Sequence, residues 1–186
     1  MRLISARLAA WSVVSFFGIV AVAAPPVPPV KPGLWETRMS ALDASGNVVP
    51  LPQASAMSGL PPEAKARMAE AMKARGLSMP DESGATKSCF TKETFESGKW
   101  QQMASEAGCT TNYSTQSSSL WKWHSSCAAL KSESDGEVVF KSPESYTVKL
   151  TTTATVMGKP NTSTRIVQAK WLGADCGDLK PFMPAK

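Results

Sequence analysis

The residues whose side chains could take part in chemistry lie close together in one stretch, residues 109–127, which reads CTTNYSTQSSSLWKWHSSC. It holds two of the four cysteines, two of the six tryptophans, one of the two tyrosines and the only histidine of the chain. A histidine beside a thiol could form a nucleophilic pair or contribute to a metal site, whereas two cysteines at the ends of a hairpin would staple it. The secondary structure that carries these side chains determines whether they form a reactive site or a stapled hairpin.

The spacing favours a stapled hairpin. If residues 117–119 form the loop, antiparallel pairing places Cys109 opposite Cys127. Opposed residues of such a pair are about 4.5–5.5 Å apart at Cα, which a disulfide accepts. His124 then lies on the other face of the hairpin, toward solvent and away from the thiols. We therefore expect His124 to be structural and no residue of the chain to be catalytic.

The same register gathers aromatic side chains on one face, with Tyr113 opposite Trp123 and Thr115 opposite Trp121. If a helix covers this face, the aromatic side chains form the core. If part of the face stays open, it forms an apolar groove of the kind that binds small molecules or partners. We expect mostly core, with an opening beside residues 77–88. The candidate groove residues are Tyr113, Trp121, Trp123, Trp35 and Trp171.

All four cysteines are expected to be oxidised, because an even number of cysteines in a small exported domain usually forms disulfides. The hairpin register pairs Cys109 with Cys127 and leaves Cys89 with Cys176. The rival pairing, Cys89 with Cys109 and Cys127 with Cys176, stays open at this point.

Export is indicated by the first residues. Arg2 and Arg7 precede an uncharged, mostly apolar run, residues 8–22, and residues 21–23 read Ala-Val-Ala. This pattern is typical of a secretory signal peptide cleaved after Ala23. The alternative is an uncleaved membrane anchor, although the run is slightly short for a bilayer span. After cleavage no stable membrane span is expected. The formal net charge of +5 falls by two when both arginines are removed, which is too mild to indicate nucleic-acid binding.

The hydrophobic pattern predicts an α+β fold: mainly an antiparallel β meander, as a curved sheet or partial barrel, with one amphipathic helix and disulfide staples. The expected strands include 33–42, 137–140, 146–156 and 162–172, with turns at 142–145 and 158–161. The helix is expected at 61–75, with Met68 and Met72 packing it on the sheet. The expected organisation is a signal peptide at 1–23, a proline-rich lead at 24–32, a single β-rich domain at 33–178 and a tail at 179–186.

Six short motifs occur in order along the chain: KPGLWE (31–36), KARGLSMP (73–80), SCFTKE (88–93), WKWHSSC (121–127), SYTV (145–148) and GADC (173–176). With the four cysteines they make the chain resemble the exported proteobacterial family known as domain of unknown function 3617, over about residues 31–176. The resemblance implies a β-rich, disulfide-bearing domain in the periplasm of a Gram-negative bacterium. It implies no activity and supplies no catalytic residues.

Three functional hypotheses follow. The first is a non-catalytic module whose aromatic sheet binds an apolar small molecule or an envelope protein, with no cofactor. The second is a copper-handling protein, because thioether sulfur is a soft ligand that suits Cu(I). Its candidate ligands are Met57, Met68, Met72 and Met79. The third is an enzyme of a type that the sequence motifs do not reveal.

Overall fold

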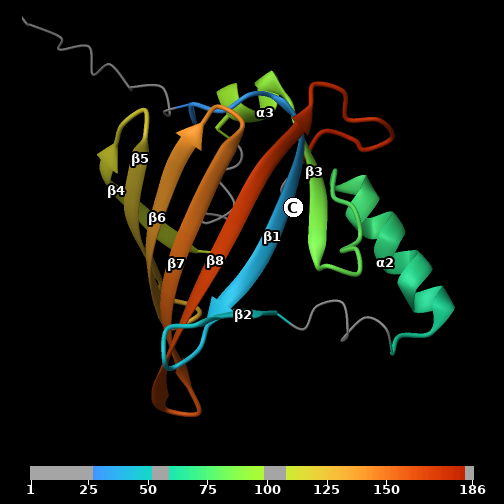
Figure 1. Ribbon diagram of the computed structural model, residues 1–186. Helices are drawn as coiled ribbons and strands as arrows, with labels where there is room; N and C mark the ends of the chain where they lie inside the picture. The colour runs from blue at the N-terminus through green and yellow to red at the C-terminus, as the bar shows by residue number, and fades with distance from the viewer. Residues whose placement is uncertain (1–26, 52–58, 99–107, 183–186) are drawn as a thin grey trace, which may run out of the picture.

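The computed structural model describes residues 27–51, 59–98 and 108–182. These residues form one antiparallel sheet in the order β2-β1-β8-β7-β6-β5-β4, with β3 also paired to β1 (Figure 1). The path is open, because β4 and the β2/β3 side are separate ends of the described sheet. The expected fold class is therefore confirmed. The expected signal peptide lies outside the described residues.

The element bounds are as follows. The strands are β1 (Gly33–Leu42), β2 (Val48–Pro50), β3 (Ala85–Phe90), β4 (Cys109–Gln116), β5 (Leu120–Cys127), β6 (Ser132–Ser142), β7 (Ser145–Val156) and β8 (Lys159–Gly173). The helices are α2 (Pro62–Ala74) and α3 (Lys92–Glu96). Within the described residues, neither helix combines the length and the hydropathy that a membrane span needs.

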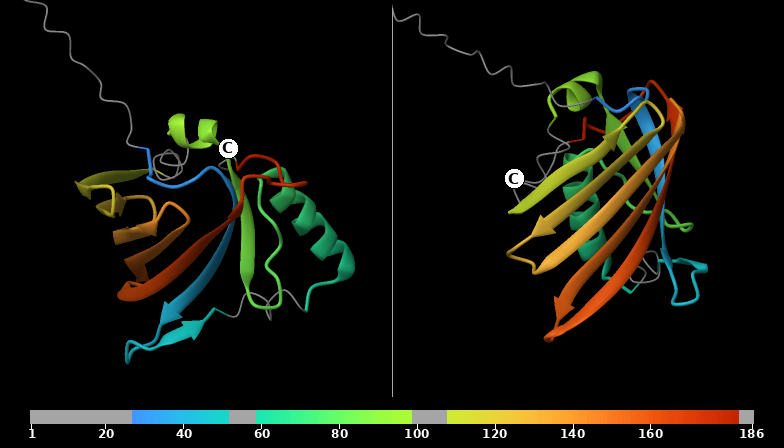
Figure 2. Two further views of the ribbon diagram at one scale, coloured as in Figure 1. Left: turned by 45° about the horizontal axis from the view of Figure 1, so that its top comes forward. Right: turned by 90° about the vertical axis from the view of Figure 1, so that its left-hand side faces the viewer.

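Strands β4 to β8 form a meander, because each pairs with the next along the chain. Alternation sets the two faces: Val138 of β6 pairs with Val148 of β7, which pairs with Val167 of β8, all on one side. Threonines occupy the other side of β7 and β8, where the hydroxyls of Thr151 and Thr164 lie 3.1 Å apart. The sheet is strongly curved, so that one face is concave (Figure 2).

The helix α2 lies beside β3 at one edge of the sheet and does not cover the concave face (Figures 1 and 2). It begins at Pro62 and ends in a Schellman motif, in which Leu77 N–H donates to the Met72 carbonyl and Gly76, at φ 76°, provides the left-handed residue. None of its described side chains is buried, and Met68 is 38% exposed. The expectation that Met68 packs this helix onto the sheet is therefore wrong.

Two local predictions need correction, and one helix was not predicted. The segment expected to border an opening, residues 77–88, contains most of β3, which pairs with β1 from Gly33 to Arg38. The hairpin of β4 and β5 has the predicted pairs up to Tyr113 opposite Trp123, but a bulge between Tyr113 and Thr115 shifts the rest. Thr115 consequently lies opposite Lys122 and not opposite Trp121. Helix α3 was not expected.

The turn between β7 and β8 is also displaced from the prediction. It is a two-residue loop of Met157 and Gly158, so that Pro160 belongs to β8. Both loop residues have positive φ, 51° and 78°, as a type I′ turn requires. Met157 is also 100% exposed, although methionine is suited neither to this backbone region nor to solvent.

We expect Met157→Asn to raise the free energy of unfolding by about 1 kcal/mol, because asparagine tolerates the left-handed region in which methionine is strained. Urea denaturation measures it. Gly158→Ala is the matched control and should lower stability, since it introduces a Cβ at a φ of 78°. An unchanged or lower midpoint for Met157→Asn would contradict the assigned turn.

Candidate functional site

The concave face carries a continuous aromatic cluster. Its buried members are Trp35 on β1, 1% exposed, and Trp121 on β5, 4% exposed. They are linked through rings on the strands between them: Trp35 to Tyr146 at 5.2 Å between centroids, Tyr146 to Phe140 at 6.0 Å, and Phe140 to Trp121 at 5.5 Å. Four of the five predicted groove residues therefore belong to this cluster or adjoin it, since Tyr113 contacts both Trp121 and Trp123.

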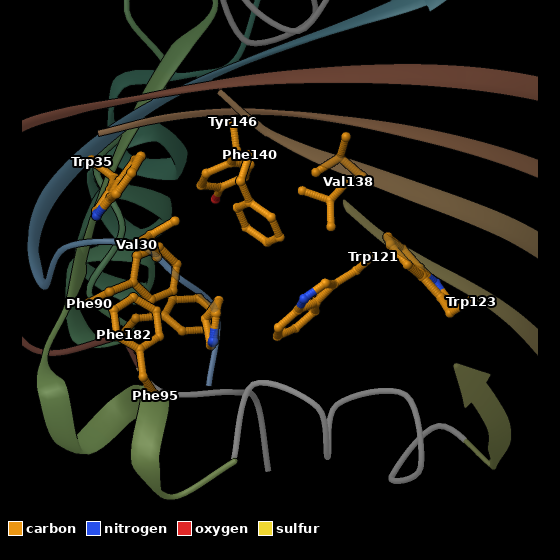
Figure 3. A pocket seen from close by; sticks show the side chains of 12 residues that line it. Val30, Trp35, Phe90, Phe95, Trp121, Trp123, Val138, Phe140, Tyr146 and Phe182 are labelled. Atoms are coloured by element: carbon orange, nitrogen blue, oxygen red, sulfur yellow. The ribbon is translucent and has the colours of Figure 1, made fainter. Parts of the chain in front are cut away.

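The cluster lines a partly open cavity of about 260 Å³ on the concave face (Figure 3). All of the lining residues among those described are apolar or aromatic. They are Pro28, Val30, Trp35, Phe90, Phe95, Trp121, Trp123, Val138, Phe140, Tyr146, Val148 and Phe182. The sheet supplies one wall, and segments outside the meander supply the other (Figure 3).

Helix α3 places Phe95 in the second wall. A capping box starts the helix: Thr94 N–H donates to the Thr91 hydroxyl at 3.2 Å, and Thr91 N–H donates to the Thr94 hydroxyl at 3.3 Å. Phe95 follows on the buried side and stacks on Phe90 at 5.6 Å. A five-residue helix is thus positioned by two threonines and by the ring that it buries.

The C-terminal segment places Phe182 in the same wall. The Cys89–Cys176 disulfide holds the chain after β8 against β3, and Phe182 N–H donates to the Cys89 carbonyl at 2.6 Å. The ring of Phe182 then contacts Phe90 at 5.1 Å. Gly76 permits this path, because a Cβ at that position would overlap the backbone of residues 180 and 182.

The proline-rich segment before β1 forms the remaining part of the wall, with Pro28 and Val30 facing the cavity. Two indoles hold it: Trp35 Nε1 donates to the Lys31 carbonyl and Trp171 Nε1 to the Pro32 carbonyl, both at 3.0 Å. Trp171 pairs with Trp35 across β1 and β8 but is not among the described residues that line the cavity. Trp171 therefore lies beside the proline-rich segment that precedes β1, and not in the groove as predicted.

The structure pairs the cysteines as the hairpin register suggested, and not in the rival arrangement. Cys109 bonds Cys127 at the base of the β4–β5 hairpin, with a Cα separation of 4.1 Å, and Cys89 bonds Cys176 at 5.6 Å. No cysteine among the described residues is a free thiol. The first bond closes the hairpin that carries Trp121 and Trp123, and the second fixes the wall that carries Phe182.

Trp123 packs flat over a glycine of the neighbouring strand. It lies directly opposite Gly136 of β6, and a Cβ at Gly136 would overlap its indole ring. Glycine therefore allows the indole to lie against the sheet at the rim of the cavity.

We expect Gly136→Ala to lower the free energy of unfolding by about 1–3 kcal/mol, the usual cost of overpacking, and to displace the Trp123 indole. Thermal unfolding and tryptophan emission measure both effects. Gly173→Ala is the matched control in β8, because a Cβ there meets no atom within 4 Å. Equal stability of the two variants would contradict the packing of Trp123 on Gly136.

Tyr146 brings the one hydroxyl of the described lining. The residue as a whole is partly exposed, but burial of its phenol end raises the pKa of Tyr146 to about 12. The indole N–H groups of Trp35 and Trp121 already donate to the carbonyls of Lys31 and Ser117. The Tyr146 hydroxyl, by contrast, forms no hydrogen bond with any residue that the structure describes.

The tyrosinate absorbance that Tyr146→Phe removes should titrate at about pH 12 and not near 10, the value of an exposed phenol. Because the folded state holds the Tyr146 proton more tightly than the unfolded state, this proton contributes to the free energy of unfolding. The contribution is fully present below pH 10 and is lost as the pH rises toward 12. Alkaline difference spectra near 295 nm of the native protein and the variant measure this. A difference spectrum with a midpoint at 10 would show that the phenol is hydrated.

The opposite, convex face carries paired charges. His124 lies there, as the hairpin register predicted, with Nδ1 2.9 Å from Asp135, and Lys122 Nζ lies 2.9 Å from Glu137. The hydrogen bond to Asp135 raises the pKa of His124. Both partners are exposed, so these pairs contribute little stability and place no acid or base in the cavity.

The copper hypothesis rests on the sequence pattern alone. Met68 and Met72 lie one turn apart on α2, Met79 follows the helix, and Met57 lies outside the described residues. Within the described ranges, no three His, Cys, Asp or Glu side chains converge as a metal site.

Sequence reasoning missed lining residues in both walls of the cavity. Phe140 and Tyr146 were missed because the turn predicted at 142–145 places Phe140 opposite Thr147; a bulge between Phe140 and Ser142 shifts the register and pairs Phe140 with Tyr146. Phe90 and Phe95 follow Cys89 without a periodic pattern, and Phe182 lies beyond the last strand. Their place depends on long-range contacts and not on local spacing.

Comparison with known proteins finds one family. A family model described as "Protein of unknown function (DUF3617)" matches residues 30–176. Neither the curated proteins nor the solved structures give a significant match.

Proposed function

The chain belongs to the family described as protein of unknown function (DUF3617), and from its aromatic cavity and the export pattern of its sequence we propose that it is an exported, non-catalytic protein of the bacterial periplasm that binds an apolar small molecule in that cavity. The cavity on the concave face is the observation that carries the proposal. Binding sites for small molecules are typically concave and lined by apolar and aromatic side chains with few polar groups. This lining has that composition.

The volume indicates the size of the molecule. A cavity of about 150 Å³ lined by aliphatic and aromatic side chains holds benzene, so about 260 Å³ suits roughly ten to twelve non-hydrogen atoms. Burial at about 0.8 kcal/mol per carbon, less an association cost of at least about 4 kcal/mol, leaves roughly 4–6 kcal/mol, which corresponds to dissociation constants of roughly 0.1–1 mM. A two-ring compound or one short alkyl chain fits these limits.

A binding role is supported over a catalytic one by the chemistry of the lining. Apolar and aromatic side chains bind by burial and do not transfer protons. The phenol of Tyr146, with a pKa of about 12, stays protonated at neutral pH. The charged pairs of the convex face lie on the other side of the sheet.

Export is supported by the signal-like pattern of residues 1–23 and by the two disulfides, which persist in oxidising compartments. Intact mass of the protein from the periplasm of a Gram-negative host should correspond to a chain that starts at Ala24. A full-length product in the membrane fraction would contradict cleavage and favour the anchored alternative.

The binding proposal is tested by calorimetric titration with 2-ethylnaphthalene, which has twelve carbon atoms. Native protein should bind it with a dissociation constant of roughly 0.1–1 mM. Val148→Phe places a larger side chain in the lining and should weaken binding at least about tenfold. Val139→Phe is the matched control, because Val139 points from β6 to the convex face, 39% exposed. No binding by native protein, or equal binding by Val148→Phe, would refute the proposal.

A further inference from the structure

The cavity contains a polar group that its apolar chemistry does not explain. Tyr146 extends from β7 into the cluster, and its oxygen points between Trp35 and Phe140 on the cavity side (Figure 3). Phenylalanine would make the same ring contacts without a polar atom. The hydroxyl has no hydrogen bond with the residues that the structure describes, although buried tyrosine hydroxyls usually have a partner.

From this geometry we infer that the Tyr146 hydroxyl is the polar anchor of the cavity, and that the ligand is a neutral apolar molecule whose carbonyl oxygen accepts its hydrogen bond. The inference rests on the proposed function, since it names the ligand class of the same cavity.

The class follows from the charges near the anchor. The phenol is a donor at neutral pH, because burial keeps its pKa far above 7. A carboxylate ligand would bring a charge into an apolar space, which is costly without a cation beside it. No cation is among the described residues that line the cavity. Lys31, which precedes β1, is engaged outside it: its Nζ lies 2.6 Å from Glu144 and 4.8 Å from the Trp171 ring centroid. Arg38, Lys141 and Lys170 border a separate hollow. A ketone, ester or quinone oxygen satisfies the phenol without this cost.

The remaining lining limits where the oxygen can lie. The indole N–H groups of Trp35 and Trp121 are already bonded to backbone carbonyls, so they do not compete for the ligand. The Trp123 indole has no hydrogen bond with the described residues, but it lies over Gly136, at the opposite end of the cavity from Tyr146 (Figure 3). The ligand body then extends along Phe140, Trp121 and Val138 toward Trp123.

The experiment compares two probes that share the naphthalene body and a two-carbon substituent: 2-acetylnaphthalene, which also has the carbonyl oxygen, and 2-ethylnaphthalene, which lacks it. Dissociation constants of both are measured by calorimetry for native protein and for Tyr146→Phe. The preference for the acetyl probe, expressed as the ratio of the two constants, should fall about three- to tenfold in Tyr146→Phe, as expected for one neutral hydrogen bond. Use of the ratio removes the different cost of taking each probe out of water.

Tyr113→Phe is the control, because Tyr113 lies on the same sheet face but not in the described lining. Its ratio should match that of native protein. A second readout is the infrared carbonyl band of bound 2-acetylnaphthalene, which should lie at lower wavenumber in native protein than in Tyr146→Phe.

The outcomes separate the two proposals. If both probes bind native protein and Tyr146→Phe leaves the ratio and the carbonyl band unchanged, the anchor is refuted while apolar binding stands. If neither probe binds native protein, the proposed function fails and the anchor fails with it. A ratio that falls equally in Tyr113→Phe would also overturn the assignment to Tyr146.

Discussion

A single curved sheet must bury its concave face, and in the described residues no second sheet or long helix covers it. The helix α2 lies at the edge beside β3 (Figures 1 and 2). The cover comes instead from short segments: residues 28–32, α3 and the chain around Phe182. Each is held by a few specific contacts, because none has enough apolar surface to dock by burial alone. Such a cover closes the end of the concave face without filling it, and the cavity is the space that remains.

The Cys89–Cys176 disulfide is the contact on which most of this cover depends. It joins residues 87 apart in sequence, and by the chain-entropy model a loop of this length stabilises the fold by roughly 4–5 kcal/mol. More important for the site, it directs the C-terminal segment across Gly76 to the β3 backbone, where Phe182 reaches Phe90. The hairpin bond between Cys109 and Cys127 acts more locally and holds the edge strand β4 to β5. The Cys89–Cys176 disulfide therefore contributes both to the stability of the fold and to the shape of the cavity.

The sequence predicts the meander well because alternation is a strong local signal: β1 agrees with its expected bounds, and the aromatic pairs of the β4–β5 hairpin share a face. It misses β3 and α3 because neither has a periodic pattern. β3 is short and rather polar, and forms through its pairing with β1, while α3 has five residues and depends on the Thr91 capping box. The β7–β8 turn was predicted in the wrong place because Gly158 and Pro160 suggest a four-residue turn. The register of the two long strands instead leaves a two-residue loop, Met157 and Gly158. Likewise, Trp35, Trp121 and Trp123 could be assigned to the site from the sequence, but the walls built by distant segments could not.

The Tyr146 hydroxyl, which has no hydrogen bond with any described residue, would have opposite consequences for the free and the bound protein. In the free protein Tyr146 costs stability relative to phenylalanine, by about 1–3 kcal/mol for an unsatisfied buried group. A ligand that supplies an acceptor removes this cost, whereas one of the same shape without an acceptor leaves it in place. Selectivity would then come mainly from the penalty on the wrong ligand and less from the strength of a single hydrogen bond. In the proposed site, the aromatic rings would supply affinity for many apolar molecules, and the phenol of Tyr146 would distinguish those that carry an acceptor at one end.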